Sequence, residues 1–226
     1  MKTKTPGICR EFLKYAYILQ LSEGCFSGPG LARKSGRSYG YTSNILKGML
    51  SRGLITRIRG SSMIGSGGRS KIMGLKPAEY KLTKRGRSEI DVVLAGGVFD
   101  ILHPGHVAFL KEARSHGDVL VVVIARDSTV VKRKGRDPFS SENNRLRMIS
   151  SLRMVDAAIL GSSKSFADTL GRVMPDTIFL GHDQHKDLSV MKRLAKKPGM
   201  KARLVMSENP LMEYSTSRIL RTIKGS

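Results

Sequence analysis

The chain of 226 residues is poor in cysteine and has no long apolar run. Its two cysteines, Cys9 and Cys25, stand too far apart for the short spacing of a metal or redox pair. A chain with so few cysteines needs no disulfides, which fits a reducing compartment. No apolar stretch is long enough to span a bilayer, and no charged-then-apolar signal segment opens the chain. We therefore expect a cytoplasmic protein without a membrane partner.

Acidic residues are also scarce, because 18 Asp and Glu stand against 40 Lys and Arg, a formal net charge of +22. The imbalance is concentrated in residues 1–88, which carry 18 basic and 3 acidic side chains. Such a local excess favours a polyanionic partner, although many basic proteins use charge only for solubility. The length allows one large domain or two small ones. We expect two, at 1–88 and 89–226.

Residues 1–88 show three helix-like segments followed by two strand-like segments around a glycine- and serine-rich stretch. The expected helices cover 10–21, 30–35 and a segment from a cap at Thr42 or Ser43 to Gly53, and the expected strands cover 54–59 and 78–82. This order predicts a winged helix-turn-helix domain. The segment 80–86 (Tyr-Lys-Leu-Thr-Lys-Arg-Gly) resembles the strand-to-turn ending of many winged-helix regulators.

In such a domain the third helix enters the major groove and the wing touches the flanking backbone. Duplex DNA is therefore an expected partner. The alternative is a domain that only packs against the rest of the chain or makes a dimer contact. The residues expected to face DNA are Arg37, Tyr39, Tyr41, Ser43, Asn44 and Lys47, with Arg57, Arg59, Arg69 and Lys71 on the wing.

After residue 88, apolar strands alternate with helices. The expected strands cover 92–95, 119–125, 157–160, 177–180 and 202–206, and the expected helices 105–115, 141–152, 166–173, 187–196 and 216–223. Continuous Val, Ile and Leu strands are typical of a parallel sheet covered on both faces. This predicts an α/β fold, a Rossmann-like doubly wound sheet with ligands beyond the carboxyl ends of its strands. The dinucleotide glycine fingerprint is missing after the first strand, which argues against a nicotinamide dehydrogenase.

The most specific motif joins the first of these strands to the helix after it. Two glycines permit a tight turn, and Pro104 suits the first helical turn. His103 and His106 share one face of that turn. Because a helix N-terminus receives anions, most often phosphate, both imidazoles can hydrogen-bond to one phosphate group. Taken singly, each of these features also has a structural explanation.

Other motifs follow the later strands. Arg126 precedes a basic loop at 132–136 that is positioned to close over a triphosphate. Glu142 and Arg145 lie one helical turn apart, and an ion pair between them is their simplest role. His182 and His185 suggest a metal site, but with no third ligand in view we favour ordinary polar roles. The segment 214–217 opens the final helix with hydroxyl and N–H groups that suit a second phosphate site.

The run Gly96-Gly97-Val98-Phe99-Asp100, followed by His103-Pro104-Gly105-His106, resembles the nucleotidyltransferase signature of the cytidylyltransferase-like superfamily. With Ala125-Arg126-Asp127, the basic run 132–136, Leu160-Gly161-Ser162 and the run 180–184, the order of motifs is similar to that of archaeal-type FAD synthases. Those enzymes adenylate FMN with ATP and a divalent metal ion.

The resemblance implies ATP and FMN as substrates and Mg²⁺ or a similar divalent ion as cofactor. It implies catalytic roles for His103, His106 and Lys132. The residues it implies at the nucleotide are Val98, Phe99, His103, Pro104, Gly105, His106, Arg126, Asp183, Tyr214, Ser215, Thr216 and Ser217. The alternatives are a cytidylyltransferase for a phosphorylated polyol or amino alcohol, and a transcriptional regulator that senses flavin or nucleotide. A homodimer is compatible with each.

Overall fold

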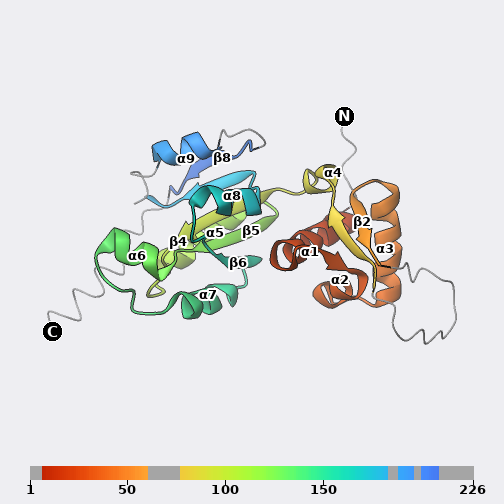
Figure 1. Cartoon of the computed structure of the whole chain (residues 1–226), viewed down its shortest axis with the longest axis horizontal. Helices are drawn as coiled ribbons and strands as arrows, with labels where there is room; N and C mark the ends of the chain where they lie inside the picture. Colours follow the sequence, from red (N-terminus) through yellow and green to blue (C-terminus); the bar gives the residue numbers. More distant parts are fainter. Residues whose placement is uncertain (1–6, 61–76, 183–187, 196–199, 209–226) are drawn as a thin grey trace. The chain divides into compact units, whose positions relative to one another are not determined.

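The computed structural model describes residues 7–60, 77–182, 188–195 and 200–208 of the chain (Figure 1). The chain divides into two compact units, Met1–Ile90 and Asp91–Ser226. Within the described ranges, no helix is long and apolar enough to cross a membrane.

The first unit combines helices with a small antiparallel sheet. Its strands lie in the order β1-β3-β2, and both outer strands are antiparallel to β3. The elements are α1 (Gly7–Glu23), β1 (Phe26–Ser27), α2 (Gly28–Ser35), α3 (Tyr39–Ser51), β2 (Ile55–Arg59), β3 (Glu79–Leu82) and α4 (Lys84–Arg87). The expected helices and strands are present. The two-residue β1 and the one-turn α4 were not expected, because segments this short carry no periodic signal.

The third helix begins earlier than the sequence predicted. The N–H of Tyr41 donates to Oγ of Ser38 at 3.3 Å, so the N-cap is Ser38 and not Thr42 or Ser43. Thr42 instead lies inside the helix, fully buried on the face that also carries Leu46. The prediction was wrong because Ser38 stands well before the first apolar residue of the helix. The first turn of α3 therefore includes both Tyr39 and Tyr41.

The second unit is built on five parallel strands in the order β6-β5-β4-β7-β8. This is the expected α/β architecture with a parallel sheet. The elements are β4 (Val92–Gly97), α5 (Pro104–Ser115), β5 (Val119–Ile124), α6 (Asp127–Lys134), α7 (Glu142–Ser150), β6 (Ala157–Leu160), α8 (Phe166–Val173), β7 (Thr177–Leu180), α9 (Leu188–Ala195) and β8 (Arg203–Met206). The expected final helix at 216–223 lies outside the described residues.

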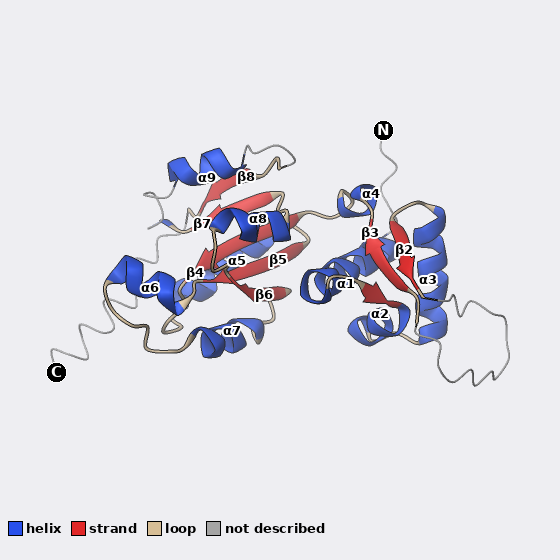
Figure 2. Cartoon of the chain, in the orientation of Figure 1, coloured by secondary structure: helices blue, strands red, loops and turns tan. Residues whose placement is uncertain are grey.

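Burial explains why these strands read as continuous apolar runs. Every residue of β5 and of β7 is buried, because helices cover both sides of the sheet (Figure 2). One core cluster joins the inner faces of α5 and α7 to the sheet through Leu110, Ile149 and Phe179. The carboxyl ends of β4 and β5 lie side by side, since Gly97 pairs with Ile124. The loops that follow these two strands are therefore neighbours.

The segment expected to be a basic loop is mostly helix. α6 ends at Gly135, whose φ of 67° is in the left-handed region that glycine favours. Lys132, Arg133 and Lys134 form the last turn of α6, where cations interact favourably with the helix dipole. The loop prediction was wrong because this short helix buries little besides Val130, too little for a helical pattern to be seen.

Candidate active site

The turn after β4 is shaped by a close contact and an unusual backbone angle. A Cβ on Gly97 would lie 2.8 Å from the ring of Phe99, so a larger residue there would displace that ring. Phe99 is buried and has a φ of 51°, which residues other than glycine rarely adopt. Such backbone strain persists only where surrounding contacts hold it, and it is common at functional sites.

The two histidines of the motif stack on one another at the start of α5. His103 is the N-cap residue with an extended backbone, and Pro104 takes the first helical turn. The two imidazole rings have their centroids 3.7 Å apart and an interplanar angle of 22°. Nδ1 of each ring is buried without a hydrogen-bond partner among the described residues. Buried polar atoms are normally paired. Two unpaired ring nitrogens beside a helix N-terminus therefore suit an anionic ligand.

Both histidines are held in the neutral form. Burial lowers the pKa of His103 below its ordinary value. Burial, reinforced by the neighbouring His103, lowers the pKa of His106 from 6.5 to about 4, and a hydrogen bond with the backbone of Ile101 acts in the opposite direction. A neutral imidazole has one N–H donor and one acceptor nitrogen. At neutral pH the pair therefore offers hydrogen bonds rather than charge.

Asp100 ties the histidine turn to the loop between α6 and α7. Its carboxylate is buried, and Oδ1 accepts a hydrogen bond from the N–H of Ser140 at 3.0 Å. Oδ2 lies 3.4 Å from Nη1 of Arg136. Because Asp100 directly follows the strained Phe99, these contacts fix the turn from its far side. The resemblance assigned no role to Asp100.

Arg145 of α7 is fully buried and holds three loops together at this edge of the sheet. Nη1 donates to the carbonyl of Val98 at 2.6 Å, and Nη2 donates to the carbonyl of Ala125 at 2.8 Å. Nη2 also pairs with Asp127, and Nε donates to the carbonyl of Ser140 at 2.9 Å. The loops after β4 and β5 and the loop before α7 thus share one guanidinium. In the sequence, Arg145 is one of 40 basic residues and carries no signal of this role.

The predicted ion pair between Glu142 and Arg145 is wrong. Glu142 pairs with Nη1 of Arg126 at 2.8 Å, while Arg145 pairs with Asp127. Asp127 and Glu142 also accept from each other's backbone N–H at 3.2 and 2.9 Å, so α6 and α7 cap one another. One helical turn of separation allows a pair but does not decide it, because both side chains have nearer partners on another helix.

The basic residues of α6 differ in their relation to the histidines. The positive charge of Lys134 contributes to lowering the pKa of His106, so the field of this ammonium reaches the histidine pair. Lys132, the residue favoured by the sequence, is exposed two positions earlier. Arg136 is drawn to Asp100 instead. Among these basic residues of the segment 132–136, Lys134 is therefore the one whose charge acts on the pKa of His106.

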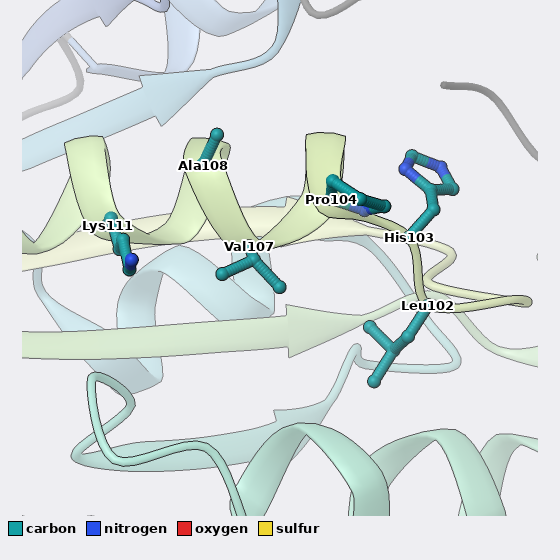
Figure 3. Close-up of a pocket in the computed structure, with 6 residues that line it drawn as sticks. All are labelled: Leu102, His103, Pro104, Val107, Ala108 and Lys111. Carbon is teal, nitrogen blue, oxygen red and sulfur yellow. The ribbon is translucent and has the colours of Figure 1, made fainter.

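A shallow groove of about 570 Å³ runs along α5 from His103 (Figure 3). The imidazole of His103 stands at one end and the side chain of Lys111 at the other (Figure 3). The remaining lining is apolar and comes from Leu102, Pro104, Val107 and Ala108. The groove thus has room beside His103 for a ligand larger than a phosphate.

Residues 94–222 match the model of the cytidylyltransferase-like family, which is more than half of the chain. The chain belongs to this family. It is a nucleotidyltransferase. The match begins inside β4 and includes the whole histidine motif, so the stacked pair and the loops tied by Arg145 belong to the family domain.

Curated relatives of this cytidylyltransferase-like protein are named FAD synthase. The one from Methanopyrus kandleri is 54% identical over 112 residues, covering 48% of this chain and 73% of the relative. The one from Aciduliprofundum boonei is 50% identical over 132 residues, covering 58% and 85%. A crystal structure from Thermoplasma volcanium, named a lipopolysaccharide core biosynthesis protein, is 44% identical with a TM-score of 0.50 and covers 53% of this chain and 98% of its own.

The structure brings together most of the described residues that were expected at the nucleotide. Val98 and Phe99 form the turn, and Pro104, Gly105 and His106 form the first turn of α5. Arg126 caps the start of α6, with Nε donating to the carbonyl of Gly161 at 2.9 Å. Asp183, Tyr214, Ser215, Thr216, Ser217 and His185 lie outside the described residues.

No cluster of three His, Cys, Asp or Glu side chains suited to a metal ion occurs in the described ranges. The exposed His182 stands at the end of the described stretch that follows β7.

The residues expected to face DNA form an exposed surface on the first unit. Tyr41, Asn44 and Lys47 recur every three residues along α3 and are exposed. The guanidinium of Arg37 lies 5.8 Å from the ring centroid of Tyr41. On β2, Arg57 and Arg59 are exposed, and Arg59 pairs with Glu79. Tyr39 is also exposed, Ser43 is half-buried, and Arg69 and Lys71 lie outside the described residues.

Proposed function

We propose that the chain transfers AMP from ATP to FMN, giving FAD and pyrophosphate. The observation that carries this proposal is the stacked, neutral histidine pair with two buried, unpaired nitrogens at the N-terminus of α5. The relatives named FAD synthase, at 50–54% identity over most of their length, supply the choice of FMN as acceptor.

The reaction needs positioning and charge stabilisation rather than a covalent intermediate. A phosphate oxygen of FMN attacks the α-phosphorus of ATP in line, and the bond to the bridging oxygen of pyrophosphate breaks. The FMN phosphate is already ionised at neutral pH, so neither a protein nucleophile nor a general base is required. With the single proton of each neutral ring on Nδ1, His103 and His106 donate hydrogen bonds to the oxygens on which negative charge increases, together with the N–H groups of α5.

The cation that assists is Lys134 rather than Lys132, because the charge of Lys134 is felt at His106. Mg²⁺ or a similar ion would be held by the phosphates of ATP and would supply positive charge beside them. When bound, it neutralises the phosphate charges that the neutral histidines do not.

The test is a comparison of acceptors and nucleotides with the purified full chain and Mg²⁺. ATP with FMN should give FAD and pyrophosphate in equal amounts, seen by chromatography and by a pyrophosphate assay. CTP with FMN should give little product. Turnover of CTP with glycerol 3-phosphate or phosphocholine, and none of ATP with FMN, would show that the chain is a cytidylyltransferase for a phosphorylated polyol or amino alcohol.

We further propose that the first unit is a winged helix-turn-helix domain that binds duplex DNA. The order of helices and strands from α1 to β3 supports this. The exposed row of Tyr41, Asn44 and Lys47 on α3 carries the proposal, because side chains of a recognition helix must be free to reach base edges. The excess of 18 basic over 3 acidic residues in 1–88 favours a phosphate backbone.

This second proposal is tested by selection of genomic fragments with the full chain at physiological salt. A preferred sequence should emerge, and Asn44→Ala should reduce the preference for it by about 1–3 kcal/mol. Binding to random duplex with equal affinity would show that the unit is a structural or dimerising module. The same selection repeated with FMN or FAD present tests whether flavin regulates DNA binding.

A further inference from the structure

Phe139 is the most exposed large apolar residue of the described chain. Its exposed fraction is 79%, and the next value, that of Ile8, is 53%. An aromatic ring left in water loses the favourable free energy of burial that phenylalanine normally gains. A single exposed apolar side chain is not unusual by itself. Phe139 is distinguished by its backbone, which is held in place by the contacts that also fix the histidine turn.

The backbone on both sides of Phe139 is held by hydrogen bonds that involve the buried side chains of Asp100 and Arg145 or the Arg136 side chain. The N–H of Ser140, the next residue, donates to the buried carboxylate of Asp100 at 3.0 Å, and its carbonyl accepts from the buried Arg145 at 2.9 Å. On the other side, Arg136 donates to the carbonyl of Asp137 at 3.0 Å and reaches Asp100. The position of Phe139 on the surface thus follows from the same contacts that build the histidine turn.

These contacts place Phe139 at the edge of the active site. Asp100 stands three residues before His103 in the turn between β4 and α5. Arg145 joins the loop of Phe139 to the same turn through the carbonyl of Val98. The loop also lies at the carboxyl edge of the sheet, where ligands of doubly wound folds bind.

We propose that Phe139 is the stacking surface for the planar ring system of the acceptor while the acceptor's phosphate lies at the histidine pair. This rests on the proposed function, in which the acceptor is FMN and carries a large aromatic ring system at the end opposite its phosphate. Phe139 would then determine acceptor specificity without taking part in the chemistry.

The surroundings of Phe139 favour a planar ligand over a protein partner. Its neighbours along the loop are Arg136, Asp137, Pro138 and two serines, so no second large apolar side chain adjoins Phe139 in the sequence of the loop. Protein interfaces need a broad apolar patch at their centre. A single aromatic face is enough for an offset stack with a flat ring.

The test measures FMN binding and turnover separately in matched variants. Phe139→Ala should raise the KM for FMN about fivefold, which corresponds to the loss of the free energy of one stacked aromatic pair. The KM for ATP should stay unchanged. Phe139→Tyr should restore it. Val131→Ala removes another exposed apolar side chain, from α6, and should leave both constants unchanged.

A second readout does not depend on turnover. The chain has no tryptophan, so Phe139→Trp introduces a single indole. Contact with this indole should quench the fluorescence of bound FMN, whereas Val131→Trp should not quench it. Unchanged KM for FMN in Phe139→Ala, with no quenching by Phe139→Trp, would overturn the proposal even if the wild type makes FAD. If Phe139→Ala changes the sedimentation of the protein but not its binding of FMN, Phe139 would lie in a contact between two copies of the chain. That result would also overturn the stacking proposal.

If the fluorescence of FMN is quenched in Phe139→Trp but the wild type forms no FAD, the stacking surface would be supported and the proposed reaction would be wrong.

Discussion

The histidine turn of the second unit and the α3 surface of the first unit are both proposed to bind phosphate groups, but they are built differently. The histidine turn is held by buried groups, with Asp100 on one side and Arg145 on the other. The row along α3 consists of exposed side chains, and the ring of Tyr41 lies near the ring of Phe12 and the guanidinium of Arg37. Catalysis requires donors fixed before the reaction, whereas binding to a polyanion requires only accessible charge.

This difference predicts that the two sites respond to different perturbations. The histidine turn should be sensitive to loss of single buried groups and to pH, and insensitive to salt at physiological concentrations. The α3 surface should tolerate single substitutions in stability and should respond steeply to salt.

Arg145→Ala should give the largest change in stability. It removes four hydrogen bonds and leaves carbonyl groups of three loops and Asp127 without their donor, so the free energy of unfolding should fall by about 3 kcal/mol. Arg147→Ala, an exposed arginine on the same helix, should change it by less than about 0.5 kcal/mol. Urea denaturation checks both. Equal stability of the two variants would show that the three loops are held by other contacts.

His106→Ala should lower turnover about 10²- to 10³-fold with the fold intact, because it removes one preorganised donor to the transition state. His116→Ala is the matched control at the other end of α5, where the ring packs on Phe179 and touches no phosphate site. It should retain near wild-type turnover. A His106→Ala enzyme with wild-type turnover would make the pair structural.

The depressed pKa of His106 predicts the pH dependence of stability. Below its ordinary pKa of 6.5 the unfolded chain binds a proton that the folded chain refuses until pH falls to about 4. The contribution of neutral His106 is therefore fully present above pH 6.5 and is lost as pH falls from 6.5 to 4, by about 3 kcal/mol at most. His106→Gln should flatten this decline in urea titrations between pH 7 and 4. An unchanged slope would mean that the imidazole is solvated.

Lys134→Ala should lower turnover about 10-fold through loss of a nearby positive charge, and Lys132→Ala should lower it by less than half. The two substitutions remove the same side chain from the last turn of one helix, so they control for effects on α6. A larger loss of turnover in Lys132→Ala than in Lys134→Ala would support the catalytic role of Lys132 that the sequence predicted.

The salt dependence of DNA affinity should change least with each substitution. It distinguishes the α3 surface from the histidine turn, because only the α3 surface is expected to respond to salt. Lys47→Ala should reduce the slope of log affinity for random duplex against log salt by about 1, without changing the rate of FAD formation. Arg59→Ala should reduce it by less, because Glu79 already neutralises part of the charge of Arg59. Equal effects of the two variants would contradict a DNA surface centred on α3.

The parallel sheet and its strands could be predicted from the sequence because burial on both faces leaves an unmistakable apolar run, as in β5 and β7. The histidine turn could be predicted because its glycine, proline and histidine residues stand in one short segment. The choice of Lys132 within the basic run stays a prediction, because α6 is too short for its spacing to show which lysine faces the histidines. The roles of Arg145 and Asp100 could not be found, since they depend on tertiary contacts such as that of Arg145 with Val98, 47 residues away, and that of Asp100 with Arg136, 36 residues away.

The central claim is tested most directly by following the α-phosphate of ATP. With ATP labelled at the α-phosphate, FMN and Mg²⁺, the wild type should place the label in FAD, and His106→Ala should do so at least about 10² times more slowly. ATP labelled at the γ-phosphate should give labelled pyrophosphate only. Absence of label in FAD under conditions where CTP and a polyol phosphate react would contradict the account.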